Sequence, residues 1–330
     1  MTVLAVEVDN LTKIYNSRNR SVDAIKLSVY EGEIFGLLGP NGAGKTTTIK
    51  MITTLTRPTA GAISVFGVNC LRNPETARAM MGYVPQAVSV DGDLTGYENL
   101  LIFSKLFFVN KEVRETRISS ALEYMGLTDR AHDLVKQYSG GMMRRLEIAQ
   151  AMVNRPKMLF LDEPTIGLDP TSRRRVWENI KQMRKEFGTT MFITTHDMNE
   201  ADELCDRLAI MDRGKIAVSG TPIDLKRTVG REVITLKTGS QIQAKSLPEN
   251  MGYITSNTQG SLTIATEKGE EAIPKILEYL KKMEIDVASI SLSKPTLDDV
   301  FMKYTNQRIS ESEDHRKVRS GRRSFMRHTR

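Results

Sequence analysis

The chain has 330 residues, of which 40% are hydrophobic and 26% charged, a composition typical of globular proteins with about two domains. Its apolar runs are shorter than the roughly 18 to 20 residues that cross a bilayer, since even Leu100 to Phe103 is followed by Ser104 and Lys105. The cysteines, Cys70 and Cys205, are too few for a disulfide framework, and no basic segment precedes the apolar N-terminus, so we expect neither a secretory signal nor an oxidising compartment.

The formal net charge of +7 is concentrated at the C-terminal end. Residues 307–330 hold eight Lys or Arg and three Asp or Glu, a net charge of +5, so the rest of the chain carries about +2. A basic tail can bind anionic lipid or nucleic acid, but polar termini rich in Ser and Arg are more often solvated and without structure. We expect residues 307–330 to be a disordered basic tail.

The first part of the chain alternates between strand and helix patterns. Period-two alternation predicts strands over Val3 to Val8 and Asp23 to Val29, and the apolar run Ile34 to Leu38 reads as a buried strand. Residues 87–150 instead show helical periodicity, and Thr95 with Glu98 forms a capping-box pattern. The remaining elements expected before residue 155 are a helix over Lys45 to about Thr54, strands over Ala62 to Phe66 and Gly82 to Pro85, and helices near 95–108, 114–125 and 141–153.

Strand and helix alternate again after Pro156. This alternation predicts an α/β fold with a mainly parallel sheet covered by helices, with residues 87–150 as a helical insertion. We assign residues 1–225 to this domain. The elements expected here are the strand Met158 to Leu161, the helix Ser172 to Phe187, the strand Thr190 to Thr195, and a hairpin made of Leu208 to Met211 and Ile216 to Ser219.

The pattern changes from about Glu232, where short strands are followed by one helix and a further strand. We therefore expect a small separate α+β domain over residues 226–306. Its expected elements are the strands Val233 to Leu236, Tyr253 to Thr255 and Leu262 to Thr266, the helix Glu271 to Met283 and the strand Val287 to Leu292.

Residues 39–47 form a phosphate-binding pattern of the type GxxxxGK[ST], placed between a buried strand and a helix. Backbone N–H groups of such a loop close around phosphate oxygens, and the helix N-terminus adds a favourable dipole. The alternative is a glycine turn that happens to contain Lys and Thr. We predict that the chain binds a nucleoside triphosphate through Gly39, Pro40, Asn41, Gly42, Ala43, Gly44, Lys45, Thr46 and Thr47.

A second signal is the apolar run Leu159-Phe160-Leu161, which delivers Asp162 and Glu163 to the carboxyl edge of the sheet, where nucleotides bind. We expect Asp162 to hold Mg²⁺ together with the Thr46 hydroxyl, and Glu163 to polarise the attacking water. The alternative is that these carboxylates only cap the following structure.

Between these two signals lies Tyr138-Ser139-Gly140-Gly141-Met142, and here residues 3 to about 220 resemble the ATP-binding subunit of an ABC transporter, a P-loop NTPase. Tyr138 and Met142 replace the Leu and Gln of the family's LSGGQ motif, and we expect hydrolysis to survive both changes. The resemblance implies catalytic roles for Lys45, Gln86, Glu163 and His196, a metal contact for Gln86, a nucleotide contact for Asp169, and adenine stacking on Tyr15. Taken singly, Gln86 could be a solvated loop residue, Asp169 a turn former, His196 a hydrogen-bonded strand end and Tyr15 a strand end without a ligand.

The resemblance also implies an assembly. Ser139, Gly140 and Gly141 would contact ATP held by Lys45 of a second copy, so that a homodimer encloses two ATP molecules. Tyr138 to Glu147 and Pro295 to Phe301 resemble the daunorubicin/doxorubicin-resistance subgroup, in which the transmembrane permease is a separate chain. The resemblance thus implies a Mg²⁺-dependent ATPase that energises an exporter of a drug, lipid or polysaccharide from the cytoplasmic face of the cell membrane.

The alternative is a soluble ABC-type ATPase acting on nucleic acid with the basic tail as its anchor. Repair ATPases of this type carry a long coiled coil between the positions of Gln86 and Ser139, and translation-factor relatives carry two ATPase domains. Neither feature is present, which disfavours nucleic acid as a partner. The residues of an ATPase subunit do not name the cargo, because the permease makes the cargo contacts.

Overall fold

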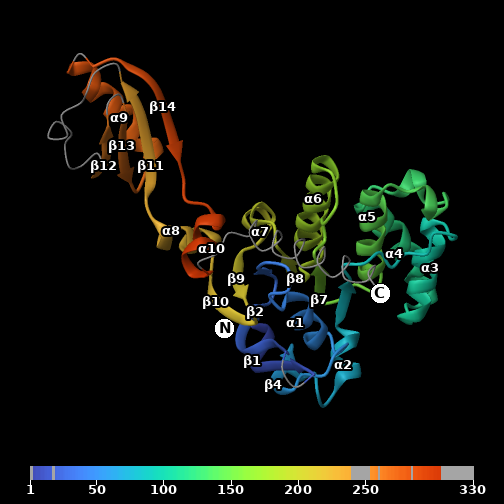
Figure 1. The fold of residues 1–330 in the computed structure, drawn as a ribbon. Helices are drawn as coiled ribbons and strands as arrows, with labels where there is room; N and C mark the ends of the chain where they lie inside the picture. The colour runs from blue at the N-terminus through green and yellow to red at the C-terminus, as the bar shows by residue number, and fades with distance from the viewer. Residues whose placement is uncertain (1–2, 17–18, 239–252, 259–260, 284, 306–330) are drawn as a thin grey trace, which may run out of the picture. The chain divides into compact units, whose positions relative to one another are not determined.

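The computed structural model describes residues 3–16, 19–238, 253–258, 261–283 and 285–305, and they fold into two compact units (Figure 1). The first unit is Met1–Pro222 and the second is Ile223–Asn306. Each unit has a hydrophobic core of its own. The basic tail expected over residues 307–330 lies outside the described residues.

The first unit contains two sheets. A four-stranded antiparallel sheet has the order β2-β1-β4-β5, and a six-stranded sheet has the order β10-β9-β3-β8-β7-β6. The bounds of the first sheet's strands are β1 Leu4–Tyr15, β2 Asn19–Tyr30, β4 Ala60–Val65 and β5 Val68–Asn69. Those of the second are β3 Ile34–Leu38, β6 Met81–Val84, β7 Met158–Asp162, β8 Thr190–Thr195, β9 Arg207–Asp212 and β10 Lys215–Gly220.

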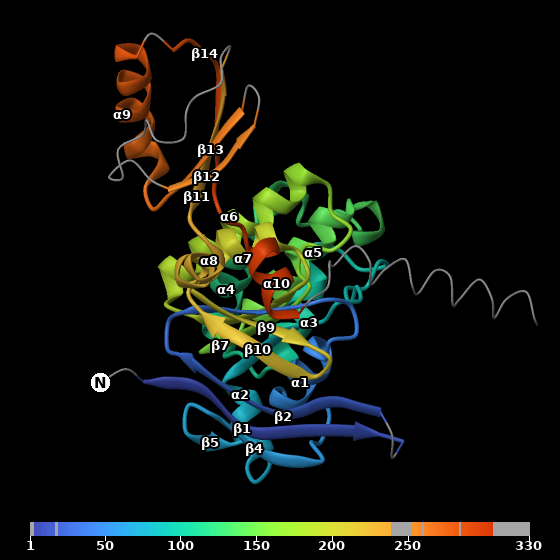
Figure 2. The same cartoon turned by 60° about the vertical axis from the view of Figure 1, so that its left-hand side comes forward.

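The six-stranded sheet is parallel except at one edge, which confirms the predicted mainly parallel sheet. β3 pairs in parallel with β8 and β9, and β7 pairs in parallel with β6 and β8, whereas β10 returns antiparallel to β9 (Figure 2). Every residue of β3, β7 and β8 is buried, as expected for strands covered on both faces. The carboxyl ends of β3, β7 and β8 therefore meet at one edge of this sheet, with the loop after β3 among them.

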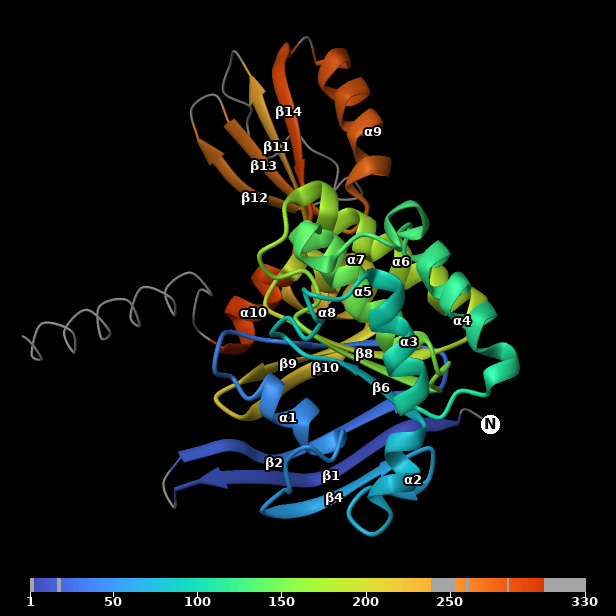
Figure 3. The same cartoon turned by 90° about the vertical axis from the view of Figure 1, so that its right-hand side faces the viewer.

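Helices cover both faces of the six-stranded sheet. Helix α1 (Lys45–Ile52) lies between the two sheets, whereas α6 (Pro170–Phe187) and α7 (Met198–Leu204) lie on the other face (Figure 3). One core joins Ile49 and Ile52 of α1 to residues of both sheets. Burial of this apolar surface, at about 25 cal/mol per Å², fixes α1 and the loop before it against both sheets.

The segment between β6 and β7 is helical, as its periodicity predicts. It contains α3 (Gly96–Leu106), α4 (Lys111–Tyr124) and α5 (Gly140–Met152), together with the short turns Thr128–Arg130 and Val135–Gln137. Thr95 and Glu98 form the expected capping box, because the Thr95 hydroxyl accepts from the Glu98 N–H and the Glu98 carboxylate accepts from the Thr95 N–H.

Two helices of the first unit are absent from the sequence-based prediction, α2 (Pro74–Ala79) and α7. Both are short, with six and seven residues, so neither shows two full turns of apolar periodicity. Helix α7 does carry a local signal, since Asp197 caps it by accepting from the N–H groups of Asn199 and Glu200.

The second unit is an antiparallel sheet with a helix packed on it. The order is β12-β13-β11-β14, and α9 covers the sheet through Ala272, Ile276 and Leu280, which pack on Ile234 and Ile264. No helix of the described residues is long and apolar enough to span a membrane. The bounds are α8 Pro222–Val229, β11 Glu232–Thr238, β12 Tyr253–Thr258, β13 Ser261–Thr266, α9 Gly269–Lys282, β14 Val287–Ser293 and α10 Leu297–Thr305.

Candidate active site

The phosphate loop and the ends of β6 and β7 enclose a cavity of about 350 Å³. Its walls combine the loop after β3 and the start of α1 with one residue from each of three distant segments, Ser21, Gln86 and Glu163. The lining is mainly polar, with backbone amides and hydroxyls at the N-terminus of α1. The lining residues are Ser21, Asn41, Gly42, Gly44, Lys45, Thr46, Thr47, Gln86 and Glu163.

Two glycines allow the loop its close approach to the rest of the unit. Gly44, which caps α1, has a φ of +113°, and a Cβ there would lie 2.4 Å from the carbonyl oxygen of Ser21. A Cβ on Gly39 would lie 2.2 Å from the carbonyl oxygen of Met211. Larger side chains at either position would push the loop away from its neighbours, so the backbone N–H groups would lose their arrangement around the cavity.

Lys45 is buried at the floor of this loop. Its ammonium group donates to the carbonyl oxygens of Gly39 and Pro40, at 2.7 and 3.2 Å, and lies 3.2 Å from Glu163 Oε1. Burial lowers the pKa of Lys45, and the carboxylates of Glu163 and Asp162 partly oppose that effect. The loop therefore holds a cation beside its N–H groups, an arrangement suited to anionic phosphate.

Asp162 ends β7 directly beside α1. Its Oδ1 accepts from the hydroxyls of Thr46, at 3.2 Å, and Thr194, at 2.5 Å. Its Oδ2 is buried and has no hydrogen-bond partner among the described residues. A buried carboxylate oxygen without a partner costs free energy, and a hard cation is the kind of group that satisfies it. Asp162 and Thr46 thus fit a Mg²⁺ site at this edge.

Glu163 is the most densely connected side chain of the cavity. Besides Lys45, its carboxylate contacts Gln86, whose Nε2 donates to Oε2 at 3.2 Å, and His196, whose Nδ1 lies 3.3 Å from Oε2. Burial by itself would raise the pKa of Glu163, but His196 and Lys45 hold that pKa below its usual value. The carboxylate is thus kept ionised, as a base that accepts a proton from water must be.

The backbone of Glu163 is held in an uncommon conformation. Its φ is +49°, in the left-handed region that non-glycine residues rarely adopt. The surrounding contacts maintain it, because the Glu163 N–H donates to both the carbonyl oxygen and the Oγ1 of Thr194. Thr194 therefore positions both carboxylates of the site. Thr194 is not among the predicted site residues, and its signal in the sequence is its place near the end of the predicted strand Thr190 to Thr195, two residues before His196.

The serine-glycine motif lies outside the cavity. Ser139 caps α5, since its Oγ accepts from the Met142 N–H, and Ser139 and Gly140 are exposed. Tyr138, which stands where the family's Leu is expected, is buried, and its hydroxyl donates to the Arg130 carbonyl oxygen at 2.6 Å. The Tyr138 side chain thereby anchors the start of α5 to the preceding turn, which a leucine could not do through a hydrogen bond.

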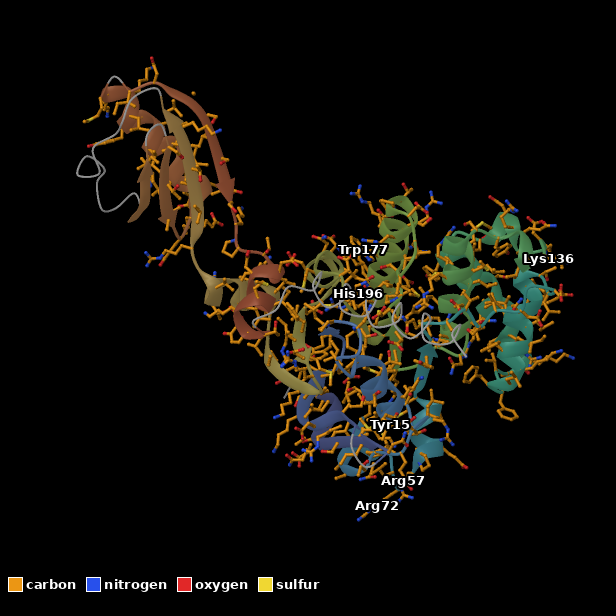
Figure 4. The ribbon with its side chains drawn as sticks, viewed as in Figure 1. Tyr15, Arg57, Arg72, Lys136, Trp177 and His196 are labelled. Atoms are coloured by element: carbon orange, nitrogen blue, oxygen red, sulfur yellow. The ribbon has the colours of Figure 1, made fainter. Side chains whose placement is uncertain are left out.

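Two further predicted site residues, Tyr15 and Asp169, are not in the lining of the cavity either. Tyr15, at the end of β1, is 39% exposed, and Figure 4 shows it among the N-terminal strands while His196 lies near α6 and α7. Asp169 is exposed and caps α6 by accepting from the N–H groups of Thr171 and Ser172. This capping contact corresponds to the turn-former alternative for Asp169.

A buried network beside His196 was also missed. Glu200 accepts from Thr165, at 2.6 Å, and from the indole of Trp177, at 3.0 Å. Burial raises the pKa of Glu200, although hydrogen bonds from Thr165, Thr195 and Trp177 oppose the shift. This network ties the segment after Glu163 to the segment after β8, and so fixes the two loops that bear Glu163 and His196.

These parts define a P-loop ATPase of the α/β type, with a phosphate loop, an aspartate that fits a metal ion, and an ionised glutamate held by a histidine and a glutamine. Residues 22–166 match the ABC transporter family, and residues 220–305 match the C-terminal domain of ATP-binding proteins of the DrrA1-3 type.

Individual relatives agree with these matches. The chain is 38% identical, over 91% of its length and 92% of the relative's, to the daunorubicin/doxorubicin resistance ATP-binding protein DrrA of Streptomyces peucetius. It is 40% identical, over 75% of its length and 78% of the relative's, to the Nod factor export ATP-binding protein I of Rhizobium etli. A dimeric ATP-binding cassette solved with ADP and Pi in a post-hydrolysis state superposes with a TM-score of 0.59 at 27% identity, over 66% of this chain and 98% of that one.

The chain belongs to the ATP-binding subunits of ABC transporters, in the group of the daunorubicin/doxorubicin resistance proteins. It is the ATP-hydrolysing subunit of an exporter-type transporter, which confirms the transporter hypothesis over the nucleic-acid alternative. Subunits of this family dimerise and pair with a membrane permease.

Proposed function

We propose that two copies of this chain close head to tail over two ATP molecules, each held by the phosphate loop of one copy and by Ser139 of the other. The main support is that Ser139 and Gly140, at the N-terminus of α5, are exposed and lie outside the cavity that contains Lys45 and Glu163. A helix N-terminus with a hydroxyl and two glycines is suited to phosphate, and a second copy can present it to the cavity.

In this proposal the residues in and beside the cavity bind phosphate, hold Mg²⁺ or act on the attacking water. Lys45 and the loop N–H groups bind the β- and γ-phosphates, and Glu163 accepts a proton from the attacking water. His196 and Gln86 orient the Glu163 carboxylate through their contacts with Oε2. Mg²⁺, held by Asp162, Thr46 and Gln86, would neutralise charge on the phosphates. Mg²⁺ is usually bound through one or two carboxylates, and the phosphates of the nucleotide and water complete its coordination.

For contact with adenine we propose Tyr15, and for contact across the dimer we propose Asp169. Both side chains are exposed. The Tyr15 ring makes a cation–π contact with Lys13, whose Nζ lies 5.0 Å from the ring centroid. A flat aromatic ring at a strand end can stack on a base without rearrangement of the fold.

We propose that the permease is a separate chain in the cell membrane and that this chain sits on its cytoplasmic face. The surface around Gln86 and the start of α3 would receive a cytoplasmic helix of the permease, because Val88 in this segment is 61% exposed. The names of the relatives point to drugs and a Nod factor as their cargo, and we propose export of a drug, lipid or polysaccharide for this chain. Co-purification of a membrane protein with the wild type should be lost in Val88→Asp, and retention would rule out this docking site.

The test of the catalytic assignment is Glu163→Gln, which keeps the size of the side chain and removes the base. We expect ATP turnover to fall by about 10² to 10⁴-fold, the usual range for a positioned base. ATP-bound dimer should accumulate, detectable by size-exclusion chromatography. The matched control is Glu178→Gln, the same change on the exposed face of α6, which should leave turnover unchanged. Undiminished hydrolysis in Glu163→Gln would refute the assignment.

A further inference from the structure

Helix α5 carries a buried ion pair, Arg144 with Glu147, outside the lining of the cavity. Arg144 Nη1 lies 3.0 Å from Glu147 Oε2, and the two side chains are 7% and 1% exposed. A buried pair is stable only when hydrogen bonds satisfy its remaining donors and acceptors. Here they are satisfied by backbone groups of two other segments, which makes the pair a junction between those segments and α5.

Arg144 binds the backbone around both Glu163 and Gln86. Its Nη2 donates to the carbonyl oxygens of Asp162, at 2.9 Å, and Glu163, at 3.1 Å, while Nε donates to that of Pro164 at 2.8 Å. Its Nη1 donates to the carbonyl oxygen of Pro85 at 2.6 Å. One planar guanidinium thus fixes three consecutive carbonyls at the end of β7 and the residue directly before Gln86.

Glu147 binds the same segment on the other side of Gln86. Its Oε1 accepts from the N–H of Ser89 at 2.5 Å and from the hydroxyl of Ser89 at 2.9 Å. Together with Arg144 on Pro85, this contact brackets the glutamine in sequence. The side chains of Gln86 and Glu163 contact each other at 3.2 Å. The backbone segments that bear both residues are therefore held by hydrogen bonds from side chains of α5.

We propose that Arg144 and Glu147 are positioning residues that couple the N-terminus of α5 to the base of the same subunit. Ser139 caps the helix at one end, and the pair lies within its first eight residues, so a displacement of Ser139 moves the backbone of Glu163 and Gln86. This inference rests on the proposed closure of Ser139 over the second copy's nucleotide. Hydrolysis of ATP in one cavity of the dimer then depends on whether the second copy's cavity holds a nucleotide.

The neighbouring Arg145 provides a matched control. It is buried to a similar extent on the same helix, but its guanidinium donates to the carbonyl oxygens of Gly141, Met125 and Gly126, all within the helical segment. Its contacts therefore do not include the segments that carry Gln86 or Glu163. The comparison of Arg144→Lys with Arg145→Lys separates loss of positioning from loss of a buried guanidinium.

The experiment is steady-state ATP hydrolysis by the full chain in the presence of Mg²⁺. A lysine keeps the charge but cannot reproduce the fork to four carbonyls, so we expect Arg144→Lys to lower kcat by about 10 to 100-fold, the cost of a misplacement of about 1 Å, with KM for ATP unchanged. Arg145→Lys should keep kcat near the wild-type value. Equal losses of kcat in the two variants would overturn the proposal.

A double-mutant cycle tests whether Arg144 acts through Glu163. In the Glu163→Gln background, Arg144→Lys should have little further effect on the residual rate, since the base it positions is gone. The same factor in both backgrounds would overturn the proposal. If Arg144→Lys unfolds below the assay temperature, Glu147→Gln is the alternative variant, because it keeps the shape of the side chain. The same loss of kcat is expected. Failure of Glu163→Gln to slow the wild type would instead count against the proposed function.

Discussion

Asp162 bears one carboxylate oxygen with two hydroxyl donors and one with no partner among the described residues. Because the partnerless Oδ2 is buried, we expect turnover to require a divalent cation, and Asp162→Asn to raise the Mg²⁺ concentration needed for half-maximal turnover. The asparagine NH₂ would also place a hydrogen-bond donor where the cation is bound, and this should weaken Mg²⁺ binding further. The measurement is a Mg²⁺ titration of ATP hydrolysis, started from protein stripped with a chelator.

The matched control is Asp129→Asn, the same change at an exposed position in the turn Thr128–Arg130. It should leave the Mg²⁺ titration unchanged. Wild-type turnover that persists in excess chelator would contradict the metal assignment for Asp162 and Thr46.

At the residue scale, motifs predicted which side chains gather but not what holds them. The phosphate loop, the strand-end carboxylates and His196 lie on segments whose order and strand patterns are visible in the sequence. Arg144 is different, because it donates to backbone carbonyl oxygens at residues 85 and 162–164, which lie far from it along the chain. Backbone carbonyls have no sequence signature, so a side chain that binds them cannot be found from residue types alone.

At the element scale, α5 and α6 approach each other closely at Gly141. A Cβ on Gly141 would lie 2.7 Å from Ser172 Oγ and 2.8 Å from Ser172 Cβ. Gly141→Ala should therefore overpack this contact and lower the free energy of unfolding by about 1 to 3 kcal/mol, measured by denaturant unfolding. The effect runs against helix propensity, which by itself favours alanine over glycine by about 1 kcal/mol.

Gly140→Ala is the matched control, one residue away on the same helix. Its Cβ would meet only Leu168 Cδ2, at 3.8 Å, which is ordinary contact, so helix propensity should make this variant neutral or more stable. Adding Ser172→Gly to Gly141→Ala should recover part of the loss. Equal stability of the two alanine variants would show that α5 and α6 do not pack as closely as the contact implies.

The elements themselves were predicted best where burial is uniform. β8 occupies the predicted residues 190–195, where Met191, Phe192 and Ile193 lie between threonines and every residue is buried. β1 is longer than predicted, extending to Tyr15, and its pairing with β2 shifts register at four places. Each shift interrupts the alternation of buried and exposed residues, so the period-two pattern is lost although the strand continues.

At the scale of the whole molecule, the two units have separate cores. Val8, Ile49 and Phe192 belong to a cluster of the first unit, whereas Ile234 and Ile276 belong to a cluster of the second. The cavity that we assign to ATP is lined only by residues of the first unit. A ligand that binds one folded unit stabilises that unit by mass action, about 2.7 kcal/mol at a hundredfold excess over Kd.

ATP with Mg²⁺ should therefore act on one of two unfolding transitions in calorimetry of the full chain carrying Glu163→Gln, which prevents turnover. We expect the transition of the first unit to move to higher temperature and that of the second to stay in place. Leu236→Ala leaves a cavity at a fully buried position in β11. It should lower the free energy of unfolding of the second unit by about 2 to 5 kcal/mol, and so lower the temperature of the second transition only. A single transition, or an equal shift of both on addition of ATP, would show that the two cores unfold as one cooperative body, since coupled units share the stabilisation of either.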